Sequence, residues 1–161
     1  MTEIGHINYD EIEVDKSATY DSLKGRVVII TGGGQGIGRG YAHYFAAQGA
    51  IPVIAELNGD AGERVADEVR AKQGKALAVQ TDVADLDSTT NMAEKTLVEF
   101  GRIDCLINNA AIFSQITMAP FWELPVDEWK RAMDVNITGS MFCARAVVPA
   151  MQKANWGRII N

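Results

Sequence analysis

The sequence is poor in cysteine and histidine and has no long hydrophobic run, and these shortages exclude several classes of protein. Cys105 and Cys143 stand in apolar surroundings without a disulfide or zinc spacing, so we expect two buried thiols in a reducing compartment. His6 and His43 are too far apart in the sequence to suggest a metal pair, and no metal is expected. His43 falls on a predicted helix, as a packing or surface residue. Neither a membrane span nor a signal peptide is visible, which predicts a cytoplasmic protein.

Positive charge is also scarce. Fifteen lysines and arginines face 21 aspartates and glutamates, for a formal net charge of −6. This balance argues against nucleic acid or an anionic membrane as partner, because both bind clustered cations. With 161 residues, 47% hydrophobic and 22% charged, the chain has the size and composition of one globular domain.

The chain divides into a polar beginning and a regular remainder. Residues 1–22 are expected to form an acidic tail, although the alternation of Ile12 and Val14 would also suit a short edge strand. Residues 23–161 are expected to form a single domain. Helices are predicted over 36–48, 60–73 (stopped by Gly74), 87–101, 126–133 and 135–153, and strands over 26–31, 51–56, 76–80, 103–107 and 158–161.

Strands separated by helices of this length form right-handed crossovers and one parallel sheet covered on both faces. The predicted fold class is therefore α/β, a doubly wound parallel sheet of the Rossmann type in three layers. We expect this domain to be incomplete, ending just after the start of its fifth strand.

The glycines that follow the first strand carry the strongest signal. Thr31-Gly32-Gly33-Gly34-Gln35-Gly36-Ile37-Gly38 comes directly after the apolar run 27–30. A strand, a glycine-rich turn and a helix N-terminus together bind a nucleotide pyrophosphate, because the backbone can approach closely and free N–H groups face the phosphates. The alternative is a turn with no ligand. The T-G-x-x-x-G-x-G spacing resembles the short-chain dehydrogenase/reductase family, and the resemblance implies cofactor binding by Gly32, Gly34, Gln35, Gly36, Ile37 and Gly38.

Glu56 ends the second predicted strand. A carboxylate there accepts hydrogen bonds from both ribose hydroxyls of an adenosine and repels a 2′-phosphate. Gln35, Leu57 and Asn58 leave the obvious neighbouring positions without a cation. The alternative is a solvated acid at a strand end, but the resemblance implies NAD rather than NADP as the cofactor.

Three further motifs extend the resemblance to residues 23–161. Asp82-Val83 matches the family's pair at the adenine, and Asn108-Asn109-Ala110-Ala111 stands where the family usually has N-N-A-G, with Asn109 and Ala110 on the ribose and nicotinamide side. Ala111 departs from that pattern. Asn136 matches the family's helix asparagine that helps to hold a water in a proton relay, although alone it would suit a residue bonding its own helix.

The resemblance implies an NAD-dependent oxidoreductase that transfers hydride between nicotinamide and a secondary alcohol or ketone, a 3-oxoacyl thioester among the candidates. The family's catalytic Ser and Tyr-x-x-x-Lys are expected beyond Asn161, so an inactive NAD-binding fragment is the alternative. Tyr20 and Lys24 fit Tyr-x-x-x-Lys as letters but precede the first strand, at the wrong end of the sheet. Apolar residues over 113–124 suit either a hydrophobic substrate or the core. Family members often form homo-oligomers through the helix at 135–153.

Overall fold

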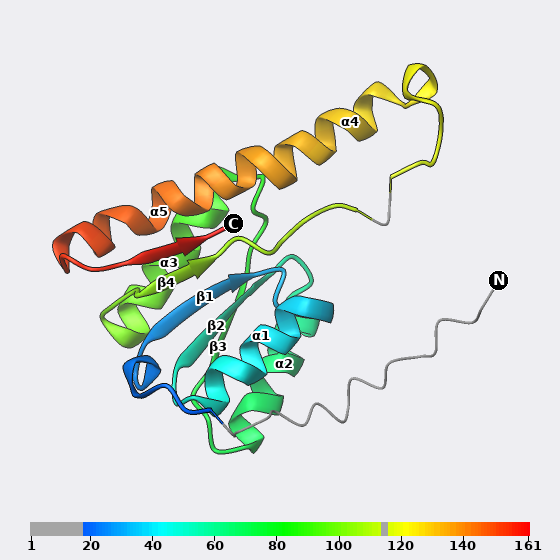
Figure 1. Cartoon of the computed structure of the whole chain (residues 1–161). Coiled ribbons are helices and arrows are strands. Elements are labelled where there is room, and N and C mark those ends of the chain that lie inside the picture. The colour runs from blue at the N-terminus through cyan, green and yellow to red at the C-terminus, as the bar shows by residue number, and fades with distance from the viewer. Residues whose placement is uncertain (1–17, 114–115) are drawn as a thin grey trace.

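A parallel sheet forms the centre of the computed structural model, which describes residues 18–113 and 116–161. The sheet has five strands in the order β3-β2-β1-β4-β5 (Figure 1). The order runs in one direction from β1 to β3 and in the other from β1 to β5, which makes the sheet doubly wound and confirms the predicted fold class. The strands are β1 (Val27–Thr31), β2 (Ile51–Glu56), β3 (Leu77–Gln80), β4 (Cys105–Ile107) and β5 (Arg158–Ile160).

Helices cover both faces of the sheet and complete three layers (Figure 1). One face carries α1 (Gly36–Ala47) and α2 (Gly59–Ala71), and the other carries α3 (Leu86–Phe100) and α5 (Gly139–Lys153). In the described ranges, no helix combines the length and apolarity needed to cross a membrane.

The middle strand shows why both layers form. All of β1 is buried, with Val27 and Ile29 in the core under α3 and α5, and Val28 and Ile30 in the core under α1 and α2. Successive side chains of a strand point to opposite faces, so a continuous apolar run is what a parallel strand covered on both sides requires.

Local capping sets most helix boundaries close to their predicted positions. The Asn58 side chain accepts a hydrogen bond from the Ala61 N–H at 3.2 Å at the start of α2, and Gly101 ends α3 with a left-handed φ of 71°. The prediction that this helix runs to Gln73 and is stopped by Gly74 is wrong. The helix ends at Ala71, and Gln73 takes the left-handed conformation with a φ of 65°.

The two predicted helices 126–133 and 135–153 join into one rod (Figure 1). Between α4 (Val126–Met133) and α5, residues Asp134–Thr138 form a single π-helical turn, so the backbone stays helical throughout. A π turn of this kind is rare and is common at functional sites.

The apolar segment after β4 is exposed and contributes little to the core. The side chains of Phe113, Met118, Phe121 and Trp122 are 87%, 100%, 88% and 78% exposed. The sequence left open whether the apolar residues over 113–124 contact a substrate or belong to the core. For these four residues the second interpretation is wrong. Cys105 and Cys143, by contrast, are buried as predicted, and burial raises the pKa of Cys105 to about 11 and that of Cys143 to about 12. Both thiols are therefore protonated at neutral pH.

Asp104 joins three segments at the amino ends of β1 and β4. Its nearly buried carboxylate accepts hydrogen bonds from the Val27 N–H at 2.9 Å, from Arg26 Nη1 at 2.8 Å and from Arg102 Nε at 2.7 Å. Burial raises the pKa of Asp104, but these donors outweigh it and hold the pKa below its ordinary value. The carboxylate therefore stabilises the fold in its ionised form.

Replacing Asp104 with alanine should lower the free energy of unfolding by about 3 kcal/mol, because it leaves buried donors unpaired. Urea denaturation at neutral pH measures this. Because the pKa of Asp104 is lower in the folded protein than in the unfolded chain, its contribution to the free energy of unfolding should be complete above about pH 5. This contribution should shrink as the pH falls below about 4. Asp21→Ala, which removes an exposed ion pair with Lys24, is the control and should change stability little. Equal losses in the two variants would contradict the role of Asp104.

Candidate functional site

A cleft of about 1140 Å³ opens at the carboxyl ends of the strands. Parallel α/β sheets bind ligands at this end, where the strand order reverses. All but one of the predicted cofactor residues line the cleft, and the exception, Gly34, is buried within the glycine turn. The predicted residues in the lining are Gly32, Gln35, Gly36, Ile37, Gly38, Glu56, Asp82, Val83, Asn109 and Ala110.

The glycine turn needs glycine for two different reasons. Gly36 has a left-handed φ of 53° and open space around it, so a side chain there would be strained and would project from a cleft-lining position. Gly38 has no such φ, but a Cβ on it would lie 2.2 Å from the Gly32 carbonyl oxygen and 2.7 Å from Asn109 Nδ2. The start of α1 therefore lies directly against the turn.

Thr31 and Asn109 tie this turn to the segment after β4. The N–H groups of Asn109 and Ala110 both donate to Thr31 Oγ1 at 3.0 Å. In return, Asn109 Nδ2 donates to the carbonyl oxygens of Thr31 at 2.9 Å and Gly32 at 3.2 Å. The Asn109 side chain thus holds the cleft wall together, and Asn109 is itself one of the lining residues.

Glu56 leaves the end of β2 and turns back to the glycine turn. Its Oε2 accepts a hydrogen bond from the Gly34 N–H at 3.0 Å, and its Oε1 accepts one from the Asn58 N–H at 3.2 Å. Gly34 must be glycine beside this carboxylate, because a Cβ there would lie 2.7 Å from Glu56 Cγ. The structure therefore brings a fixed negative charge to the wall of the cleft.

Asp82 and Val83 form the wall after β3. Asp82 Oδ1 accepts from the Ala84 N–H at 2.9 Å, and Ser88 Oγ accepts from the Asp82 N–H at 2.9 Å, which fixes the turn. Val83 is buried against α5 at Gly139, where a Cβ would lie 2.9 Å from Val83 Cγ2. These two contacts place an exposed carboxylate and a buried apolar side chain next to each other.

Asn136 lies in the π turn and outside the lining of the cleft. Its Oδ1 accepts from the Ile112 N–H at 2.8 Å, and its Nδ2 donates to the Ile112 carbonyl at 3.1 Å. Ile112 does line the cleft. The side chain of Asn136 therefore holds the segment after β4, and Ser140 Oγ donates to its backbone carbonyl at 3.1 Å.

Several charged residues of α4 and its junction with α5 reach the cleft without having been predicted. Lys130 and Arg131 bring cations to the lining, and Asp127 and Asp134 bring carboxylates. Their sequence carries no motif. The structure reveals them, because the rod carries α4 beyond the sheet on the side of the cleft (Figure 1).

Tyr20 and Lys24 lie at the opposite end of the sheet, as expected from their position before β1. The Tyr20 N–H donates to Gln48 Oε1 at 2.9 Å, beyond the C-terminal end of α1, and Lys24 pairs with Asp21 at 2.7 Å. Neither residue lines the cleft.

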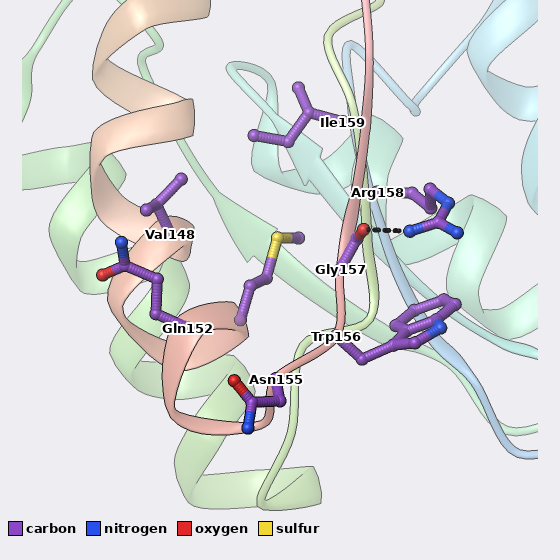
Figure 2. A pocket seen from close by; sticks show the side chains of 8 residues that line it. Val148, Gln152, Asn155, Trp156, Gly157, Arg158 and Ile159 are labelled. Atoms are coloured by element: carbon purple, nitrogen blue, oxygen red, sulfur yellow. Dashed lines mark hydrogen bonds between the residues drawn. The ribbon is translucent and has the colours of Figure 1, made fainter.

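A second hollow, of about 440 Å³, lies between the end of α5 and β5 (Figure 2). In Figure 2, Trp156 and Arg158 lie on the other side of the β5 backbone from Val148 and Gln152. Arg26 and Arg158 place their guanidinium carbons 4.0 and 5.2 Å from the centre of the Trp156 ring. The hollow contains none of the predicted site residues.

The geometry of the cleft agrees with a comparison against protein families, in which residues 26–161 match the model of the short chain dehydrogenases. The chain belongs to the short chain dehydrogenase family. The resemblance predicted from the glycine turn is thereby confirmed.

Relatives and solved structures of this family share the same region. The chain is 42% identical over 139 residues to an uncharacterized oxidoreductase of Thermotoga maritima, covering 86% of this chain and 53% of that protein. It is 36% identical over 151 residues to trans-4-hydroxycyclohexanecarboxylate dehydrogenase of Sinomonas cyclohexanicum, and this match covers 90% of this chain and 57% of that protein. The chain therefore spans about half the length of these relatives.

Two solved structures resemble the fold of this chain. NAD⁺-bound xylitol dehydrogenase superposes with a TM-score of 0.81 at 31% identity, covering 85% of this chain and 52% of that one. A metagenomic short-chain oxidoreductase in complex with NADP gives a TM-score of 0.80 at 31% identity, covering 87% and 62%. The fold is thus compatible with a nicotinamide cofactor, and the two structures differ in which one they hold.

Gly38 and Gly40 provide a matched test of the turn, since both lie in α1 and a Cβ on Gly40 would meet nothing within 4 Å. Gly38→Ala should destabilise the protein by about 2 kcal/mol because backbone atoms oppose the new methyl group. Gly40→Ala should stabilise it by up to about 1 kcal/mol through helix propensity. Thermal and urea unfolding measure both, and a neutral Gly38→Ala would contradict the close approach.

Proposed function

We propose that the protein is an NAD-dependent oxidoreductase that transfers hydride between nicotinamide and a secondary alcohol or ketone. The observation that carries the NAD assignment is the carboxylate of Glu56, fixed by the Gly34 and Asn58 N–H groups at the wall of the cleft. Membership of the family supports the class of reaction.

A carboxylate in this position favours a ribose with free hydroxyls. Its oxygens accept hydrogen bonds from the 2′- and 3′-hydroxyls, whereas a 2′-phosphate would bring two negative charges together. Glu56 lies on the same wall as the glycine turn, so a dinucleotide with its pyrophosphate at the turn has its adenosine ribose within reach of Glu56.

The remaining lining residues suit the other parts of NAD. The N–H groups at the start of α1, beside Gly36 and Gly38, would hold the pyrophosphate, and Asp82 and Val83 would hold the adenine. Asn109 and Ala110 would face the second ribose. When bound, NAD supplies the nicotinamide ring that accepts or donates the hydride.

Asn136 has a positioning role in this proposal. Its side chain is occupied by the backbone of Ile112, so it would shape the nicotinamide end of the cleft through that segment. As the resemblance to the family implies, Asn136 would also help to hold a water of a proton relay.

The substrate we propose is a small alcohol or ketone with an apolar portion, a 3-oxoacyl thioester being one candidate. The exposed side chain of Phe113, which lines the cleft, supports this proposal, and Met118, Phe121 and Trp122 add exposed apolar surface further along the segment after β4. Two similar proteins are named for xylitol and for trans-4-hydroxycyclohexanecarboxylate, both hydroxylated compounds. We further propose a cytoplasmic location and assembly as a homo-oligomer.

A second candidate function is nucleotide binding without turnover. Among the residues that line the cleft in the described ranges there is no tyrosine, serine or histidine, and the one hydroxyl, that of Thr81, donates to the Val79 carbonyl at 2.9 Å. Alcohol oxidation needs a group that accepts the hydroxyl proton, and a positioned acid or base contributes roughly 10²–10⁴ in rate. This lining supports cofactor binding, and in this second candidate function the bound nucleotide is not turned over.

Calorimetric titration of NAD⁺ and NADP⁺ into the protein tests the proposal, with NAD⁺ expected to bind more tightly. Gly36→Val should abolish binding of both cofactors, because its side chain would enter the cleft at a left-handed position. Gly40→Val is the matched control, in the same helix but outside the cleft, and should keep NAD⁺ binding. Glu56→Ala should weaken NAD⁺ binding by about 1–3 kcal/mol.

Assaying NAD⁺ reduction over a panel of secondary alcohols separates the two functions. NAD⁺ binding with turnover supports the oxidoreductase, and binding without turnover supports the second candidate. Tighter binding of NADP⁺ than of NAD⁺ would contradict the assigned role of Glu56.

A further inference from the structure

Arg64 reaches the glycine turn from α2. Its Nη2 donates to the carbonyl oxygen of Gly34 at 3.1 Å. The N–H of the same Gly34 donates to Glu56 Oε2 at 3.0 Å. A guanidinium and a carboxylate therefore hold the two polar groups of one residue of the glycine turn, and of these two side chains Glu56 lines the cleft.

The guanidinium is available for further contacts. The Arg64 side chain is 60% exposed, and its Nε lies 4.0 Å from Glu68 Oε1. Within residues 18–113 and 116–161, the hydrogen bond to Gly34 is the one that Arg64 donates. Arginine has five N–H donors in a planar fork that matches phosphate, so most of its capacity is unused.

Glu68 restricts where this side chain can go. Its Oε2 accepts from Arg39 Nε at 2.7 Å and lies 2.9 Å from His43 Nε2, both on α1. Burial raises the pKa of Glu68, but the hydrogen bonds of Arg39 and His43 outweigh it and lower the pKa overall. An ionised Glu68 anchored to α1 therefore places a carboxylate 4.0 Å from Arg64 Nε, beside the glycine turn.

We propose that Arg64, which bonds the glycine turn next to Glu56 from outside the cleft lining, is a latent phosphate-binding residue, and that Glu56 is what prevents it from accepting the 2′-phosphate of NADP. This rests on the proposed binding of NAD in the same cleft. Removing the carboxylate frees the Gly34 and Asn58 N–H groups and leaves Arg64 as a cation bonded to that turn. The discrimination between the two cofactors is thus divided between an acid that excludes phosphate and a base beside it.

The sequence alone did not predict that Arg64 lies near Glu56. Neither Gln35 nor the residues after β2 are basic, and Arg64 lies five residues into α2, within the first turns of the helix. Its contact with Gly34 spans 30 positions of the chain and depends on how α2 packs beside α1.

The test compares NAD⁺ and NADP⁺ binding by calorimetry in four proteins: wild type, Glu56→Ala, Glu56→Ala/Arg64→Met and Glu56→Ala/Arg70→Met. Arg70 is the matched control, since it lies on the same helix but bonds Glu63 and Asp67 on the surface. Glu56→Ala should bind NADP⁺ at least about tenfold more tightly than wild type does. The Arg64→Met double variant should lose that gain, and the Arg70→Met double variant should keep it.

Two further readouts separate a phosphate contact from a disturbed turn. Glu56→Ala/Arg64→Lys should retain part of the NADP⁺ affinity, because it keeps the charge without the planar fork. The NADP⁺ affinity of Glu56→Ala should fall more steeply with salt than that of Glu56→Ala/Arg64→Met, since exposed charges are screened. Thermal unfolding of each variant confirms that it is folded.

Three results decide between the proposals. If Glu56→Ala gains no NADP⁺ affinity, or if removing Arg64 leaves the gain intact, Arg64 is not a phosphate-binding residue, and NAD⁺ binding by the wild type still supports the proposed function. If the wild type binds neither NAD⁺ nor NADP⁺, the proposed function itself is wrong.

Discussion

The hydrogen bonds between Thr31 and Asn109 hold the two turns that follow β1 and β4, and the cleft depends on them. Thr31 Oγ1 receives two backbone N–H groups from the second turn, and the Asn109 amide returns to two carbonyls of the first. One of these carbonyls, that of Gly32, is also the atom that Gly38 approaches most closely. The position of α1 relative to the sheet therefore follows from a contact between two strand ends.

The opposite end of the sheet is held by charge instead. Asp104 binds the Val27 N–H and two arginines, and Arg26 continues onto the face of Trp156. The two ends of β1 and β4 are thus fixed in different ways, with neutral hydrogen bonds beside the cleft and ion pairs away from it. Where β2 meets the glycine turn, the charges are those of Glu56 and Arg64, which both bond Gly34.

The fold was predictable from the sequence because its signals are local. The apolar runs gave the strands, β2 at the predicted residues, and the glycine spacing located the turn and the family. What the sequence left out depends on contacts between distant segments. The roles of the Asn109 and Asn136 side chains and the reach of Arg64 and Lys130 come from partners far along the chain. Gln73 replaced Gly74 as the left-handed residue because α2 ended before the expected stop.

The pairing of β1 with β4 has a consequence for how the chain folds. β1 is complete by Thr31, but its neighbour on one side begins at Cys105, after three helical crossovers. Closing a loop of that length costs entropy before any strand contact forms, which slows the folding of sheets dominated by distant pairs. The adjacent β1 and β2 are joined by α1 alone and have the shorter loop to close. During synthesis, the edge of β1 that pairs with β4 therefore stays unpaired until β4 and the segment after it, which also lines the cleft, have been made.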